Sequence, residues 1–222
     1  MRQHYHDQLD EITADLIAMT QHIESAMERA TRALLNADRA LAEAVISDDA
    51  TIDALAQKIE DDCVGIVALQ QPVATDLRLL VGALRMSATL ERMGDLAAHV
   101  AKQARLRHPN LSIPTELRAT FSMMGAIATS VVQKVSGVLE TRNLELAASV
   151  AIADADMDRL HRELFTTVLS STWTHGVEAA IDVTLLSRYY ERFADHGVSI
   201  ARRIAYIATG DMPSKSELAE NA

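Results

Sequence analysis

The sequence contains one helical pattern twice, in two long segments one hundred residues apart. In residues 79–104, apolar side chains recur every three or four positions: Leu79, Ala83, Met86, Leu90, Met93, Ala97, Val100 and Ala104. In residues 179–204 the corresponding series is Ala179, Val183, Leu186, Tyr190, Phe193, Gly197, Ile200 and Ile204. This spacing is that of one face of an α-helix, so the repetition predicts a duplicated helical protein.

Each half contains three long helical segments separated by short breaks. We expect helices at about 4–36, 38–69, 72–107, 114–141, 143–171 and 177–209. Asp38 is suited to cap the second helix, and Pro72 is suited to the first turn of the third. The predicted fold is therefore all-α, with six long antiparallel helices in two tandem, pseudo-symmetric three-helix bundles. We place the bundles at residues 1–109 and 110–210, followed by a polar, frayed tail at 211–222.

Composition supports this fold and narrows the classes of function. The chain has 222 residues, of which only 8 are Gly, 4 are Pro and 4% are aromatic, as is typical of helical proteins. Its net charge of −10 argues against nucleic acid as a main partner. The N-terminus lacks the apolar core of a signal peptide and no apolar run reaches 18 residues, so we predict a cytoplasmic protein.

Pairs of carboxylates four residues apart mark the last helix of each half. Glu91 and Asp95 flank the apolar stripe of the first repeat, and Glu191 and Asp195 take the same positions in the second. Side chains four apart lie one above the other on a helix, where two like charges repel. One such pair is usually a solvated surface, but the same pair in both repeats favours a function.

A second set of acids lies on the preceding helices, at Asp49 and Asp53 and at Asp154 and Asp158. Residues equidistant from the turn of an antiparallel hairpin lie side by side. The midpoint between the first two acid pairs is residue 72, and that of the second two lies between residues 174 and 175. Both midpoints fall in the expected turns, so each half should bring four carboxylates to one level.

Four carboxylates at one level are either a hydrated acidic patch beside Arg92 or Arg192, or a cation site. Oxygen ligands suit Mg²⁺, Ca²⁺, Mn²⁺ or iron, and Zn²⁺ is less favoured because cysteine is absent nearby and histidines are few. His99, one turn past Asp95, is a candidate to join or support the first site. We interpret both quartets as metal sites whose metal is not specified by the sequence.

Motifs of catalysis are missing from the sequence. There is no glycine-rich phosphate loop, no Gly-x-Ser-x-Gly and no Cys/His nucleophile pair, so we predict a non-enzyme. A di-iron protein of storage or redox function remains an alternative, although its Glu-x-x-His signature is approached only by Asp158 and His161. A purely structural helical scaffold is a third interpretation.

Three stretches resemble a known family. ALQQPVATDLR (68–78), TLERMGDLAAHVAK (89–102) and YERFADHGVSIARRIAYIATG (190–210) are similar to the signatures of PhoU, the phosphate-uptake regulator. The resemblance implies two three-helix bundles with metal clusters at the acidic motifs: Asp49, Asp53, Glu91 and Asp95, then Asp154, Asp158, Glu191 and Asp195. It also implies a cytoplasmic homodimer that acts with the ATPase of the phosphate ABC transporter and with a phosphate-sensing histidine kinase, as a negative regulator.

Overall fold

The structure is a computed structural model that describes residues 2–220. Its elements are α1 (Arg2–Asn36), α2 (Arg39–Gln70), α3 (Ala74–Arg107), a 3₁₀ turn (Thr115–Leu117), α4 (Arg118–Thr141), α5 (Leu144–Val168), α6 (Gly176–Thr209) and α7 (Lys215–Ala219). Within these residues there is no strand. The predicted all-α class is therefore confirmed. Within the same range, no helix combines the length and hydropathy that crossing a bilayer requires.

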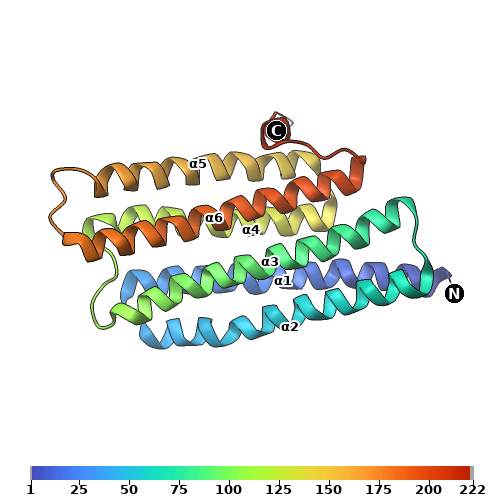
Figure 1. Cartoon of the computed structure of the whole chain (residues 1–222), viewed down its shortest axis with the longest axis horizontal. Helices are drawn as coiled ribbons and strands as arrows, with labels where there is room; N and C mark the ends of the chain where they lie inside the picture. Colours follow the sequence, from blue (N-terminus) through green and yellow to red (C-terminus); the bar gives the residue numbers. More distant parts are fainter. Residues whose placement is uncertain (1, 221–222) are drawn as a thin grey trace.

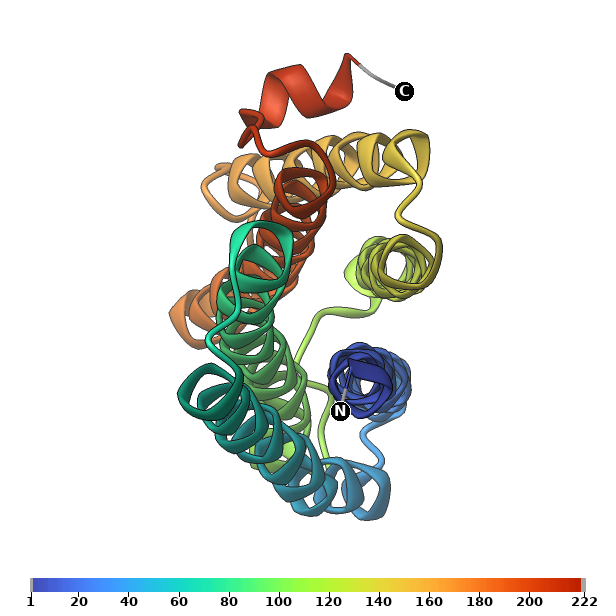
Figure 2. The same cartoon turned by 90° about the vertical axis from the view of Figure 1, so that its right-hand side faces the viewer.

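The six long helices form two elongated three-helix bundles that lie side by side (Figure 1). Helices α1, α2 and α3 make the first bundle and α4, α5 and α6 make the second. Figure 2 shows that α3 and α6 run next to each other where the bundles meet, while α2 and α5 lie at the two outer ends. The predicted pseudo-symmetric pair of bundles is confirmed by this arrangement.

The duplication extends to the caps of α2 and α5. Asp38 accepts a hydrogen bond from the backbone N–H of Leu41, and Asn143 accepts one from Leu146. The residue before each cap is left-handed, with φ of 49° at Ala37 and 55° at Arg142. Because the side-chain oxygen satisfies a free N–H group at the helix start, each cap fixes where the chain reverses.

The two hairpin turns fall where the acid pairs place them, but they differ in length. The first turn spans 71–73 and the second spans 169–175. Pro72 lies before the extended N-cap Val73, so its expected place in the first turn of α3 is wrong by two residues. Helix α5 has 25 residues against 32 in α2, and it ends at Val168, short of the expected 171. The second half is therefore shortened at this end of its hairpin.

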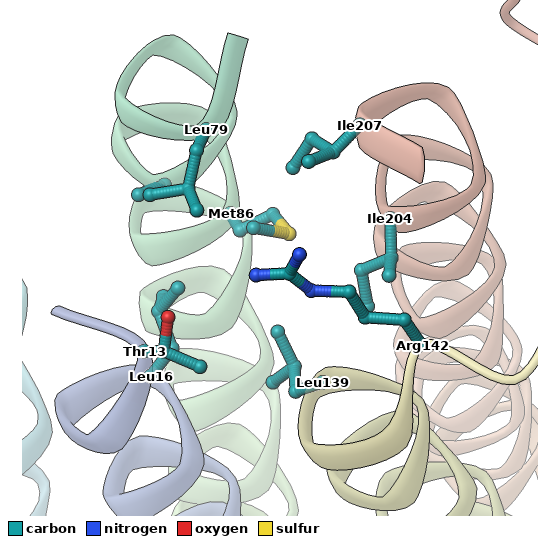
Figure 3. Close-up of a pocket in the computed structure, with 9 residues that line it drawn as sticks. Thr13, Leu16, Leu79, Met86, Leu139, Arg142, Ile204 and Ile207 are labelled. Atoms are coloured by element: carbon teal, nitrogen blue, oxygen red, sulfur yellow. The ribbon is translucent and has the colours of Figure 1, made fainter. Parts of the chain in front are cut away.

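The two bundles share one continuous apolar core. Thr31 of α1 and Tyr190 of α6 are 2.7 Å apart at their hydroxyl oxygens, and Tyr190 is fully buried. Burial raises the pKa of the Tyr190 phenol above its ordinary value. A small, mainly apolar cavity of about 30 Å³ remains between the bundles, and the guanidinium of Arg142 points into it beside Met86 (Figure 3). Most of the lining is apolar, and Thr13 and Arg142 provide its polar groups.

Residues 211–220 of the C-terminal tail are folded, so the expectation that the tail frays is wrong for this part. Ser214 and Glu217 form a reciprocal capping box that starts α7, and Leu218 is 2% exposed. Arg202 of α6 also donates through Nε to the Pro213 carbonyl at 2.6 Å. Helix α7 packs on α5 and α6 at the outer end of the second bundle (Figure 2). The capping box and the buried Leu218 therefore order this polar segment.

Candidate metal sites

Asp49 of α2 lies close enough to Asp53 and to Asp95 of α3 for their charges to act on it. Asp49 is half-buried, and its Oδ1 lies 3.0 Å from the position that a Cβ would take on Gly94. Glycine therefore lets the carboxylate approach the backbone of α3. Burial raises the pKa of Asp49, and the neighbouring charges of Asp53 and Asp95 raise it further. The arrangement thus concentrates negative charge beside a helix surface.

The remaining members of the first quartet are held less tightly. Glu91 is half-buried one turn before Asp95, and in the described chain it has no hydrogen-bond or ion-pair partner. Arg92 Nη1 donates to Asp95 Oδ2 at 3.0 Å. His99 Nδ1 lies 2.6 Å from the Asp95 carbonyl oxygen, and its ring packs against Tyr189 of α6. Arg92 and His99 therefore flank the acids and support Asp95.

The second quartet is gathered around an ammonium group. Asp154 is fully buried and forms an ion pair with Lys215 of α7. Lys215 Nζ also lies 3.4 Å from Asp158 Oδ2 and 4.0 Å from Asp195 Oδ1. This lysine brings a positive charge into the place where a metal ion between α5 and α6 would be bound. The sequence analysis did not include Lys215 among the site residues.

Glu191 completes the second quartet from α6. Burial raises the pKa of Glu191, and Asp195 and Asp158 raise it further. Arg188 forms the ion pair with Glu191, whereas the expected supporting residue, Arg192, is exposed. Burial also raises the pKa of Asp154, although the charge of Lys215 and its contact with this carboxylate oppose the shift. Each of these acids is thus easier to ionise when a further cation is present.

A third acidic group, Glu11, Asp15 and Asp62, lies between α1 and α2 and was not predicted. Among the described residues this is the one group of three or more whose possible ligand atoms all lie within 4.8 Å of one another, so neither predicted quartet converges to that distance. Lys58 Nζ lies among them, 3.0 Å from Glu11, 2.5 Å from Asp15 and 3.3 Å from Asp62. Because a lysine of the same bundle already balances this group, it is an ion-pair network.

The two predicted quartets fit a hard cation by their chemistry. Their ligand atoms are carboxylate oxygens, which Mg²⁺, Ca²⁺, Mn²⁺ and iron accept. Asp49 lies near two further acids and has no ion-pair partner in the described chain, and the acids of the second quartet are paired with Lys215. The di-iron alternative fits less well, because His161 Nδ1 lies 3.0 Å from Ser187 Oγ, within hydrogen-bond distance.

The sequence contains one signal that bears on Lys215, which the sequence analysis did not include. Ser214 and Glu217 have the Ser-x-x-Glu spacing of a capping box, which predicts a helix start at 215. That signal places Lys215 in the first turn of a helix, but not against Asp154, 61 residues earlier in the chain. The contact depends on where α7 packs, and a tertiary contact of this kind has no local signature.

Fold and site together define a class: a duplicated helical-bundle protein with a carboxylate quartet between the last two long helices of each bundle. A family model described as "PhoU domain" matches twice, at residues 16–104 and 121–204, one match for each bundle. The chain belongs to the PhoU family.

Relatives span nearly the whole chain. "Phosphate-specific transport system accessory protein PhoU homolog 2" of Mycobacterium tuberculosis is 49% identical over 96% of this chain and 100% of that protein. Homolog 1 of Mycobacterium leprae is 47% identical over 96% of each chain. The crystal structure of PhoU from Pseudomonas aeruginosa is similar with a TM-score of 0.84 at 28% identity, covering 93% of this chain and 100% of that one.

Proposed function

We propose that this protein is a metal-dependent accessory regulator that restrains phosphate uptake and phosphate-starvation gene expression when phosphate is plentiful. The observation that carries the proposal is the pair of carboxylate quartets, one in each match to the PhoU domain. The names of the relatives support the connection with phosphate-specific transport. We infer a regulator that works by binding, located in the cytoplasm.

Metal at the quartets would join the helices that carry them. A cation between Asp49 and Asp95 ties α2 to α3, and one between Asp154 and Asp195 ties α5 to α6. Each cation also removes the repulsion among acids whose pKa is raised by their neighbours. The expected consequence is a stiffer pair of hairpins, because ligands that bind only the folded state stabilise it.

Stiff hairpins matter because their ends present apolar surface. Leu69 and Leu169, at the ends of the two hairpins, are each 80% exposed, and Val73 and Val177 are 74% and 76% exposed. Exposed apolar residues grouped at equivalent places are typical of interaction surfaces. We propose that these ends contact the ATPase of the phosphate ABC transporter and the phosphate-sensing histidine kinase, and that the protein acts as a homodimer.

Two double substitutions test the proposal: Glu91→Ala with Asp95→Ala, and Glu191→Ala with Asp195→Ala. The matched control is Glu60→Ala with Asp61→Ala, which removes two exposed acids from α2 outside the quartets. Metal content is measured by mass spectrometry on protein purified without chelator, and starvation-gene expression is measured in high phosphate. We expect each quartet variant to lose the metal of its own bundle and to weaken repression, while the control retains both.

The same experiment separates the alternatives. Full metal content and full repression in both quartet variants would show that the acids are merely solvated, as in a structural scaffold. Oxygen-dependent turnover of bound iron, or the spectrum of coupled iron atoms, would instead favour a storage or redox protein of di-iron type. Pull-downs of the transporter ATPase and of the kinase, at high and low phosphate, test the partners directly.

A further inference from the structure

A hollow lined by three arginines lies between α3 and α6, away from both quartets. It has a volume of about 560 Å³ and is formed by the start of α3, the end of α6 and Met212. Arg78, Arg85 and Arg203 line it, and no acidic residue of the described chain does. A volume of this size is that of a small-molecule site. In a protein with a net charge of −10, a hollow with three positive charges and no acid needs a reason.

The three guanidinium groups are poorly balanced by the protein itself. In the part of the chain that the structure describes, the side chains of Arg85 and Arg203 have neither a hydrogen-bond nor an ion-pair partner. Arg78 donates from Nη2 to Thr75 Oγ1 at 3.1 Å, but its Nε is buried without a partner. Burial and the charge of Arg85 lower the pKa of Arg203. An anion bound in the hollow would balance positive charge that the protein leaves without a partner.

The duplication provides an internal reference for this hollow. Helices α3 and α6 are related by an offset of one hundred residues, so each contact at one end of their interface has a counterpart at the other. At the first end, Arg107 is balanced: its Nε lies 2.6 Å from Asp182 Oδ2, its Nη2 lies 3.0 Å from Asp182 Oδ1, and Glu178 also pairs with it. Acidic side chains of α6 thus neutralise the arginine of α3.

At the second end the corresponding positions carry no acid, and one of them is an arginine. Gly82 stands where Asp182 stands in the repeat, Arg78 replaces Glu178, and Ile207 replaces Arg107. The nearest acid along α3, Asp76, is engaged elsewhere, since its Oδ2 accepts a hydrogen bond from Tyr5 at 2.9 Å. The interface that is closed by internal ion pairs at one end is therefore open and cationic at the other.

We propose that Arg78, Arg85 and Arg203 form a binding site for a phosphate-bearing small molecule in the groove between α3 and α6. Guanidinium groups bind phosphate oxygens through paired N–H donors, which favours this anion over a simple counter-ion. The other walls are apolar: Leu77 and Val81 are each 41% exposed and Met212 is 43% exposed, with Tyr206 beside them. These walls fit the organic part of a nucleotide as well as leaving room for free phosphate.

Binding is tested by calorimetry on the full chain, titrated in separate arms with inorganic phosphate, ATP, ADP and sulfate. Chelator is present throughout, so that metal-bridged phosphate at the quartets does not contribute and the result is independent of the proposed function. We expect saturable binding of a phosphate compound, weakened at least about tenfold by Arg85→Gln and by Arg203→Gln. Tighter binding of a nucleotide assigns an organic phosphate, and equal affinities assign free phosphate.

The matched control is Arg105→Gln, which removes an exposed arginine of α3 outside the hollow and should leave affinity unchanged. Arg203→Lys keeps the charge but loses the paired donors, so it should give an intermediate affinity. The proposal is overturned if no phosphate compound binds, if sulfate binds as tightly as every phosphate compound, or if the arginine variants bind like the wild type. Thermal melting of each variant shows that the fold is intact.

Discussion

The two carboxylate quartets take equivalent positions in the two bundles, yet they are balanced in different ways. In the first bundle Asp49 lies against Gly94 with other acids as its closest charges, and no lysine forms an ion pair with it in the described chain. In the second, Asp154 is fully buried beneath Lys215, and Ala194 replaces the glycine. The first quartet is thus open to a cation from solution, whereas the second holds a cation that belongs to the chain.

This difference shows which features the duplication has kept. The lengths of α3 and α6, the caps at Asp38 and Asn143 and the placement of the acids are common to both halves. Lys215 lies after the second repeat, in α7, whereas the first repeat is followed by the 3₁₀ turn Thr115–Leu117, which has Thr115 at the corresponding position and leads into α4. A lysine outside the duplicated unit therefore gives the second quartet an ion-pair partner that the first quartet lacks.

The largest expected effect is on metal affinity at the second quartet. Lys215→Ala removes an ammonium that a metal ion must displace, so we expect the second site to bind metal at least about tenfold more tightly. The first site, in the other bundle, should be unchanged. Affinities are measured by calorimetry with Mn²⁺, in a background carrying Glu91→Ala and Asp95→Ala when the second site is read alone.

Lys102→Ala is the control for this comparison. Lys102 is exposed on α3, and its charge acts on Asp49 from a distance without an ion pair. Its removal should change affinity at the first site only slightly and leave the second site unaffected. Equal metal affinities at the two sites of the wild-type chain would contradict the view that Lys215 competes with metal.

Lys215→Ala should also reduce the stability of the protein when metal is absent. Without Lys215, the carboxylate of Asp154 is left buried and unbalanced, at a cost of about 1–2 kcal/mol after allowance for the partial exposure of the lysine. Chemical unfolding is followed by the fluorescence of Trp173, the one tryptophan of the chain, which lies in the α5–α6 turn. Saturating Mn²⁺ should reverse the loss.

Cys63 gives a second reporter, in the first bundle. It is the one cysteine of the chain, it is buried, and burial raises the pKa of its thiol to about 12, so it reacts only when α2 opens. Because the bundles share a core, we expect thiol labelling and Trp173 fluorescence to report the same transition. Labelling at a denaturant concentration where the fluorescence is unchanged would instead show bundles that unfold separately.

Exchanging Gly94 and Ala194 between the two bundles tests whether the glycine sets the position of the neighbouring carboxylate. Gly94→Ala places a Cβ 3.0 Å from Asp49 Oδ1 and 3.0 Å from Ile52 Cδ1, so the carboxylate has to move away from α3. We expect metal affinity at the first quartet to fall about threefold. Stability should change little, because alanine in a helix offsets the crowding by up to about 1 kcal/mol.

The reverse substitution, Ala194→Gly, is the matched measurement in the second bundle. It should cost about 1 kcal/mol of stability through helix propensity alone, with metal affinity at the second quartet retained. Calorimetry measures the metal affinity of both variants, and chemical unfolding measures their stability. A loss of metal affinity in Ala194→Gly that equals the loss in Gly94→Ala would mean that the glycine does not set the position of Asp49.

The sequence was sufficient for the long helices because their determinants are local or periodic. The stripes that include Leu90 and Tyr190 predict buried faces, and the cap at Asp38 and the break at Asn143 predict where helices start. The position of Lys215 against Asp154 was not predictable, because it depends on how a five-residue helix packs on a distant one. The hollow at Arg78, Arg85 and Arg203 escaped for the same reason, since its arginines come from helices that meet only in the fold.

The smallest expected effect concerns pH and the unbalanced acid of the first quartet. The pKa of Asp49 in the folded protein is raised by burial and by Asp53 and Asp95, so the folded state holds this proton more tightly than the unfolded chain does. Its ionisation therefore destabilises the metal-free fold as pH rises above the ordinary pKa of an aspartate, about 3.9. Asp49→Asn should remove this loss, so the variant gains stability over the wild type with rising pH, by less than about 1 kcal/mol. Unfolding of both proteins in chelator across that range measures the difference, and a constant difference would show that Asp49 is already balanced without metal.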